Sequence, residues 1–127
     1  MQRKTILLAD DDPGMIKILS HILAVEGYIV LKESNGAAAL NTARDSRPDL
    51  IIIDLNMPFM TGLEALSRLR SEEPRLDIPA ILLTANDPDD LREQVEPLGG
   101  VRLLEKPFDL EELTKLVQDS LGLPGGS

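Results

Sequence analysis

The sequence predicts a doubly wound α/β domain, in which helices cover both faces of a five-stranded parallel sheet. Short apolar runs alternate along the chain with segments whose apolar residues recur at helical spacing. The run at 50–54 has no polar residue before Asp54, as expected of a central strand that is buried on both faces. Helix-capping residues and glycines separate these segments, so each strand is followed by one helix.

The first two strand–helix units lie in the first third of the chain. A strand at 6–9 runs into three consecutive aspartates, and the pair Asp12-Pro13 is typical of a helix N-terminus. The helix that follows is expected to bury one face, formed by Met15, Ile18, Leu19 and Ile22. A second strand at 28–31 precedes a helix that Asn35 caps.

The third and fourth units repeat this order. The strand at 50–54 leads into a helix that begins with a capping box formed by Thr61 and Glu64. A fourth strand is predicted at 78–84, and the more polar helix after it is broken at Pro97. Residues 50–53 and 80–83 are apolar throughout, and for the strand that ends at Asp54 this is the pattern of a central strand.

The fifth unit completes the sheet. Its strand is predicted at 101–104, and Asp109 caps the last helix. The buried face of that helix is expected to comprise Leu110, Leu113, Val117 and Leu121. Short connections and right-handed crossovers favour the flavodoxin-like strand order 2-1-3-4-5. We expect one domain over 1–121, with 122–127 as a short tail or the start of a linker.

The composition excludes several classes of protein. The 127 residues include no cysteine, which excludes disulfides, thiolate metal sites and cysteine nucleophiles and fits a cytoplasmic setting. The net charge of −9 argues against binding of nucleic acid or anionic membranes by this domain. No apolar run approaches the roughly 20 residues that cross a bilayer. The first strand begins too early in the chain for a signal peptide.

Polar residues end four of the five predicted strands, and parallel strands bring these ends to one edge of the sheet. The residues concerned are Asp10, Asp11, Asp54, Thr84 and Lys106. Carboxylates crowded in this way repel one another unless a cation neutralises them, and Mg²⁺ prefers such oxygen ligands. A carboxylate nucleophile, a metal ion, an ammonium and a hydroxyl together suit phosphoryl transfer onto aspartate.

Four motifs, in this order and spacing, resemble those of the receiver domains of response regulators in two-component signalling, including the chemotaxis regulators. The motifs lie at 6–12, 54–62, 82–85 and 106–108. Each motif alone is weak evidence, but the four together cover the chain from end to end. The resemblance therefore implies a phosphorylation switch on a flavodoxin-like fold.

The resemblance also implies a role for each acidic residue of the site. Asp54 is expected to be the phosphoacceptor and to contact the metal. Asp10 and Asp11 are expected to be the acidic pair that holds Mg²⁺, with Asp11 as a direct ligand. The backbone carbonyl of Asn56 is expected to be a further metal ligand.

The remaining motif residues imply how the phosphoryl group is recognised. Thr84 is expected to be the hydroxyl that moves toward the phosphoryl group, and Lys106 the lysine that contacts it. Pro107 follows Lys106 through a peptide bond that is often cis in this family. The chain departs from the family at Leu103, where an aromatic switch residue is usual, so the form of the output surface is left open.

Partners follow from the same resemblance. The expected phosphodonor is a sensor histidine kinase or a phosphotransfer protein, and the expected output is a downstream effector domain or protein. A homodimer through the fourth helix, fifth strand and fifth helix is a further expectation. The domain is expected to be a self-phosphorylating acceptor, with autophosphatase activity at most, rather than a turnover enzyme.

Two other functions remain as alternatives. A hydrolase with an aspartyl-phosphate intermediate would usually carry a second aspartate at position 56, where this chain has Asn56. A receiver-like module that is never phosphorylated would usually lack the acidic pair, the acceptor or the lysine. Asp12 is interpreted as a helix cap, and His21, the only histidine, as structural or exposed. The acidic residues around 89–93 are interpreted as a solvated face.

Overall fold

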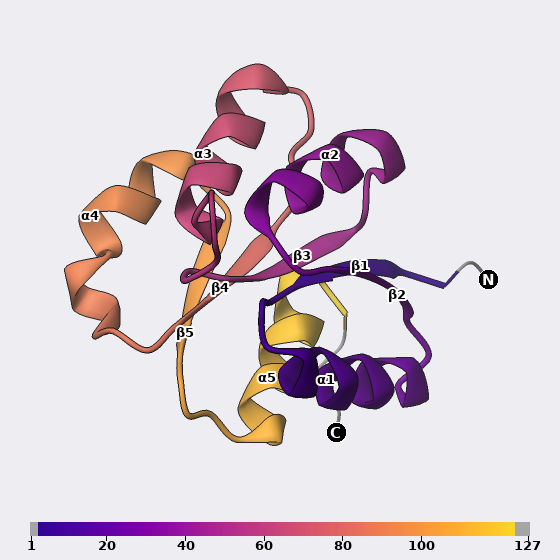
Figure 1. Ribbon diagram of the computed structural model, residues 1–127. Coiled ribbons are helices and arrows are strands. Elements are labelled where there is room, and N and C mark those ends of the chain that lie inside the picture. The colour runs from indigo at the N-terminus through magenta and orange to yellow at the C-terminus, as the bar shows by residue number, and fades with distance from the viewer. Residues whose placement is uncertain (1–2, 124–127) are drawn as a thin grey trace.

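The computed structural model describes residues 3–123, and Figure 1 shows a central sheet between two layers of helices. The strands are β1 (Thr5–Ala9), β2 (Ile29–Glu33), β3 (Leu50–Asp54), β4 (Ala80–Thr84) and β5 (Val101–Glu105). The helices are α1 (Pro13–Val25), α2 (Gly36–Ser46), α3 (Gly62–Glu72), α4 (Arg92–Val95) and α5 (Leu110–Ser120). Neighbouring strands are parallel in the order β2-β1-β3-β4-β5, which confirms the predicted topology. Within the described range, no helix combines the length and the apolar character needed to cross a membrane.

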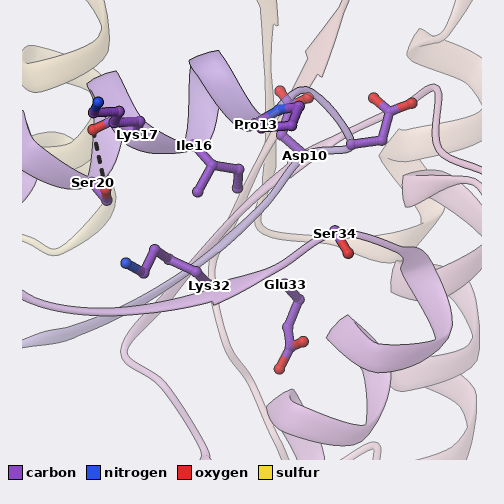
Figure 2. Close-up of a pocket in the computed structure, with 9 residues that line it drawn as sticks. Asp10, Pro13, Ile16, Lys17, Ser20, Lys32, Glu33 and Ser34 are labelled. Carbon is purple, nitrogen blue, oxygen red and sulfur yellow. Dashed lines mark hydrogen bonds between the residues drawn. The ribbon is translucent and has the colours of Figure 1, made fainter.

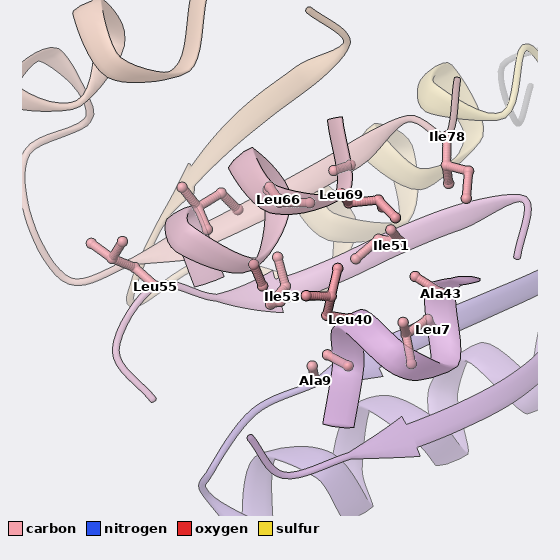
Figure 3. Packing of buried hydrophobic residues seen from close by; sticks show 14 of the residues in the cluster. Leu7, Ala9, Leu40, Ala43, Ile51, Ile53, Leu55, Leu66, Leu69 and Ile78 are labelled. Atoms are coloured by element: carbon pink, nitrogen blue, oxygen red, sulfur yellow. The ribbon is translucent and has the colours of Figure 1, made fainter. Parts of the chain in front are cut away.

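The core consists of two apolar clusters, one on each face of the sheet. Successive residues of a strand point to opposite faces, so a strand covered on both sides contributes to both clusters. In β3, Ile51 and Ile53 pack in the cluster on the side of α2 and α3, where Figure 3 shows Leu40 beside them. Leu50 and Ile52 pack on the opposite side with residues of α1 and α5. The whole of β3 is buried, which confirms its prediction as a central strand.

Side-chain caps confirm the predicted starts of the first three helices. The Gly14 N–H donates to Asp12 Oδ1 at 2.9 Å at the start of α1. Asn35 caps α2 in the same manner, with its Oδ1 as the acceptor. Thr61 and Glu64 form the predicted capping box at the start of α3. Asp12 therefore acts as a helix cap, as its position before a proline indicates.

Two apolar side chains that are expected in the core are instead exposed. Ile18 of α1 is 56% exposed, and Leu110 of α5 is 47% exposed. Leu19 and Leu23 bury the inner face of α1. Ile18 and Leu110 line one open pocket at the start of α5, where neither helix covers the apolar side chain of the other. Helical spacing identifies the apolar residues but does not give the width of the contact with the sheet.

The fourth helix is shorter and more broken than predicted. The segment consists of a 3₁₀ turn at Pro88–Asp90, the four-residue α4, and a second 3₁₀ turn at Glu96–Leu98. Pro97 has no N–H to donate, so the α-helical hydrogen-bond pattern ends before it. Leu91 and Val95 are buried and attach this segment to the sheet.

Four strands differ by one or two residues from their predicted limits, and β1 and β5 are each one residue longer than predicted. The second strand begins at Ile29 and extends to Glu33, beyond the predicted range of 28–31. The fourth begins at Ala80 instead of residue 78. Pro79 lies directly before Ala80 and lacks the N–H that a strand residue donates to its neighbour, which accounts for the later start.

Candidate functional site

Three charged side chains from distant parts of the chain meet at the carboxyl edge of the sheet. Asp10 follows β1, Asp54 ends β3 and Lys106 follows β5. The Lys106 Nζ lies 3.2 Å from Asp10 Oδ2 and 3.3 Å from Asp54 Oδ2, so one ammonium bridges two carboxylates. The parallel strand order produces this meeting, because it brings the ends of β1, β3 and β5 to the same edge.

The two bridged carboxylates are buried and held in a fixed orientation. Asp10 is 1% exposed and Asp54 is 5% exposed. The Asp12 N–H donates to Asp10 Oδ1 at 3.0 Å, and the Asn56 N–H donates to Asp54 Oδ1 at 3.4 Å. In both cases the backbone N–H of the residue two positions after the aspartate donates to Oδ1, the carboxylate oxygen that does not face Lys106. The other oxygen of each carboxylate therefore points to a shared centre.

A third carboxylate, that of Asp11, lies at the same centre. Carboxylate oxygens of Asp10, Asp11 and Asp54 lie within 4.8 Å of one another, and Asp11 is exposed to solvent. Three carboxylates around one ammonium leave an excess of negative charge. An all-oxygen donor set with this excess suits a hard divalent cation, which favours carboxylates and retains some of its waters. The residues of the site therefore fit a metal ion.

Thr84 and Asn56 lie next to this centre in different ways. Thr84 is fully buried at the end of β4, one residue beyond Leu83, which pairs with Asp54 in the sheet. The Thr84 hydroxyl oxygen accepts a hydrogen bond from the Asn86 N–H at 2.9 Å, so its own hydrogen is left for another partner. Asn56 is exposed and contributes its backbone amide to Asp54.

The charges at the centre shift the pKa values of Asp54 and Lys106. Burial raises the pKa of Asp54, and the neighbouring carboxylate of Asp10 raises it further, while Lys106 opposes both. Burial alone would lower the pKa of Lys106, but Asp54 and then Asp10 outweigh it and raise the pKa. The ionised form of Asp54 is thus disfavoured on balance, even with the ammonium beside it.

The raised pKa of Asp54 predicts that Asp54→Asn stabilises the metal-free protein at neutral pH. Ionised Asp54 lowers the stability of the folded state, because folding raises the pKa above the ordinary value of 3.8. This cost is present above the raised pKa and disappears as the pH falls toward 3.8. Urea unfolding of both proteins in EDTA should therefore show a difference that shrinks on acidification. A difference that grows on acidification would contradict the prediction.

Two glycines that the sequence marks only as loop and helix-start signals hold the loop after Asp54 in place. A Cβ on Gly62 would come closer to the Asp54 carbonyl oxygen than real Cβ atoms do, and one on Gly36 would meet the Met60 carbonyl oxygen in the same way. The Gly62 N–H donates to the Leu55 carbonyl oxygen at 2.9 Å and closes the loop. Glycine at the first residue of α2 and of α3 is the signal in the sequence for this close approach.

An open pocket of about 400 Å³ adjoins the acidic residues between α1 and β2. Figure 2 shows Asp10 and Pro13 on one side of this pocket and Lys17 and Lys32 on the other. Asp11 also lines the pocket. Small reagents can therefore reach the acidic edge from solvent without any movement of the backbone.

The other polar residues singled out in the sequence lie away from the centre. His21 is exposed on α1, in keeping with a structural or exposed role. Asp89 and Asp90 are exposed, and Asp89 pairs with Arg92 at 2.8 Å, as expected of a solvated face. Leu103 is half-buried and packs against the apolar cluster on the side of α2 and α3.

This chain resembles known proteins over almost the whole of its own length, both in sequence and in structure. The family description "response regulator receiver domain" matches residues 6–118. The "Probable transcriptional regulatory protein TcrX" of Mycobacterium tuberculosis is 38% identical over 112 residues, which are 88% of this chain and 47% of that protein. Sporulation initiation phosphotransferase F of Bacillus subtilis is 32% identical over 123 residues, which are 97% of this chain and 98% of that protein. The chain thus spans about half the length of one relative and nearly all of the other.

A solved structure extends the likeness to three dimensions. It is the receiver domain of the sensor histidine kinase PA1611 from Pseudomonas aeruginosa PAO1, with a magnesium ion coordinated in the active site cleft. The TM-score is 0.84 at 31% sequence identity, over 95% of this chain and 99% of that one. The likeness therefore extends over nearly the whole fold.

Proposed function

The chain belongs to the response regulator receiver domain family of two-component systems, and we propose that it functions by accepting a phosphoryl group on Asp54. The observation that carries this proposal is the bridge of Lys106 Nζ to Asp10 and Asp54, at 3.2 and 3.3 Å. A buried nucleophilic carboxylate, an adjacent ammonium and two further carboxylates are the groups that phosphoryl transfer to aspartate requires.

In the proposed reaction, a carboxylate oxygen of Asp54 forms a bond to the phosphorus of the donor. The bond from phosphorus to the leaving nitrogen or oxygen breaks, and the leaving group keeps its electron pair. The product is an acyl phosphate on Asp54. We propose the phosphohistidine of a sensor kinase or phosphotransfer protein as the donor in the cell, and small acyl phosphates as donors in solution.

We propose that Asp10, Asp11 and Asp54 hold Mg²⁺ together with the backbone carbonyl of Asn56. The support is the donor set itself, whose carboxylate oxygens lie within 4.8 Å of one another. The magnesium reported in the cleft of the PA1611 receiver domain supports the same choice of metal. When bound, the ion would neutralise negative charge on the carboxylates and on the incoming phosphoryl group.

We propose that Thr84 and Lys106 bind the new phosphoryl oxygens, through a hydroxyl hydrogen and an ammonium. Phosphorylation adds roughly −1.5 to −2 charges, and a change of this size biases a two-state surface. That surface is assigned to α4, β5 and α5, which we also propose as a homodimer contact. Because Leu103 replaces the usual aromatic residue, the change at β5 would proceed by movement of an aliphatic side chain.

The proposal extends to the unit that performs this function. We assign the receiver to residues 1–121 and a tail or linker to 122–127, of which 124–127 lie outside the described residues. Effectors, the cognate kinase and a cytoplasmic location are proposals drawn from the family. Slow hydrolysis of the acyl phosphate by the domain itself is the only turnover that we assign to it.

Incubation with acetyl phosphate and Mg²⁺ tests the proposal directly. We expect a single phosphoryl group, stable in acid and labile in base, that intact mass spectrometry detects and peptide mapping assigns to Asp54. Labelling should depend on Mg²⁺, because the ion offsets the charge of the carboxylates.

Asp54→Asn should abolish this adduct. The matched control is Asp12→Asn, because asparagine also caps helices and Asp12 lies beside the same site. Labelling of the control should match the wild type. An adduct that persists in Asp54→Asn, or its absence from the wild type, would refute the proposed function.

A further inference from the structure

Phe59 combines two features that are unfavourable for a phenylalanine. Its side chain is 99% exposed, although the chain has only two phenylalanines and the other, Phe108, packs against the core. Its φ of 70° lies in the left-handed region, which bulky residues rarely adopt. The Met60 N–H donates to the Pro58 carbonyl oxygen at 2.8 Å, so Phe59 is the central residue of a strained three-residue γ-turn.

The loop that carries Phe59 is firmly held. The Leu55 N–H donates to the Leu83 carbonyl oxygen at 2.8 Å, and the Gly62 N–H closes the loop on Leu55. Leu55 and Met57 are buried, and Met60 packs against the core. The ring of Phe59 is thus presented to solvent by an anchored turn. Single exposed apolar residues are common, but a strained turn that projects an aromatic ring is not.

The position of this turn determines what can contact it. Asp54 is only 5% exposed, so a protein that transfers a phosphoryl group to it must cover the surrounding edge of the sheet. A specific interface of ordinary size covers about 800 Å² on each partner. Phe59 follows Asp54 by five residues, which reach at most roughly 17 Å when fully extended, and the Gly62 hydrogen bond closes the loop between them. A footprint centred on Asp54 therefore extends to the turn that carries Phe59. Small phosphodonors need no such footprint.

We propose that Phe59 anchors the protein phosphodonor, by inserting its ring into an apolar pocket beside the phosphohistidine of that partner. This inference rests on the proposed function of Asp54 and names a contact of the same site. Aromatic side chains that bury their whole area often dominate the affinity of an interface. The turn holds the ring in place before binding, which reduces the entropy lost when the complex forms.

Phe59→Asn and Phe59→Tyr test the proposal. Asparagine tolerates positive φ and removes the ring, whereas tyrosine keeps the ring in the same turn. We expect Phe59→Asn to leave Tm unchanged or to raise it by about 2–4 °C, because strain is relieved and no packing is lost. Acetyl phosphate should label both variants at the wild-type rate.

Transfer from a protein donor should separate the two variants. Each sensor histidine kinase of the source organism is purified, autophosphorylated with ATP and mixed with the wild type to find the most efficient donor. Phe59→Asn should lower kcat/KM for that donor by about tenfold or more, and Phe59→Tyr should retain it.

Each other outcome overturns this inference. Unchanged transfer to Phe59→Asn would do so, as would a lower Tm, which would show that the ring supports the fold. A wild-type dimer that Phe59→Asn dissociates would assign the ring to a second copy of the chain. Labelling by acetyl phosphate but by no kinase would exclude the proposed partner, whereas no labelling by acetyl phosphate would refute the function of Asp54 itself.

Discussion

Replacing Gly62 with alanine is expected to lower the free energy of unfolding by about 2–3 kcal/mol. The added methyl group would overlap the carbonyl oxygen of Asp54 and come within 3.1 Å of Leu82 Cδ1. Neither neighbour can easily move, since Asp54 ends the central strand and Leu82 is fully buried. The loop would have to shift, and it carries the hydrogen bond from the Asn56 N–H to the Asp54 carboxylate. Urea unfolding measures the loss, and labelling by acetyl phosphate should slow in parallel.

Gly14→Ala is the matched control for this prediction. Gly14 also lies in the first turn of a helix, but the nearest atom to an added Cβ is a side-chain oxygen of Asp12 at 3.3 Å. That carboxylate can adjust by a few tenths of an ångström, so the change should be close to neutral. Equal stability of wild type and Gly62→Ala would mean that the loop yields without cost and would contradict the packing argument.

Replacing Lys106 with methionine is expected to reduce the rate of labelling by acetyl phosphate by about 10²-fold. The ammonium is the cation that faces Asp10 and Asp54, and without it both carboxylates stay buried and repel the incoming phosphoryl group. The metal-free variant should also lose about 1–3 kcal/mol of stability, less than for a fully buried pair because the lysine side chain is 22% exposed. Unfolding in EDTA and single-turnover labelling measure the two effects.

Metal binding distinguishes a charge effect from lost packing in this variant. Without Lys106, three carboxylates remain without an opposing charge, so Mg²⁺ should raise the Tm of the variant by more than that of the wild type. Lys115→Met, at an exposed position of α5, is the control and should behave as the wild type. An equal response of Lys106→Met and wild type to Mg²⁺ would contradict the electrostatic account.

The pKa of Lys106 sets the pH range over which this contribution should persist. The carboxylates raise the pKa above the ordinary value of 10.5, so the charged form is stabilised by folding. The contribution is therefore present at neutral pH and is lost as the pH rises through the raised pKa. Wild type and Lys106→Met should converge in stability in strongly alkaline solution, and again in acid once Asp54 is protonated.

Much of the fold and the meeting of the charged groups could be predicted from residue patterns. Continuous apolar runs identify the strands, and the polar residues that follow them mark the carboxyl ends of these strands. In a parallel sheet all of these carboxyl ends lie at the same edge. This reasoning places Asp10, Asp54 and Lys106 together before any distance is known. Residues that follow different parallel strands lie close together in space, even when they are far apart in the sequence.

Other features depend on three-dimensional contacts that spacing does not contain. The exposure of Ile18 and Leu110 depends on an open pocket between α1 and the start of α5, and periodicity describes each helix alone. The close approach at Gly62 involves a backbone carbonyl oxygen. Every residue has such an oxygen, so residue types do not show where one comes close to a glycine. The turn at Phe59 opposes the usual preference of phenylalanine, so propensities point away from it.

The separation of 96 positions between Asp10 and Lys106 has a consequence for synthesis of the protein. A ribosome completes β1 and β3 long before β5, so the nascent chain carries the acidic groups without their ammonium partner. Lys106 directly follows the edge strand β5, so its ammonium is translated after every strand of the sheet. If Asp54 is the phosphoacceptor, chains that terminate before β5 should therefore lack the ammonium and accept a phosphoryl group far more slowly than the whole domain.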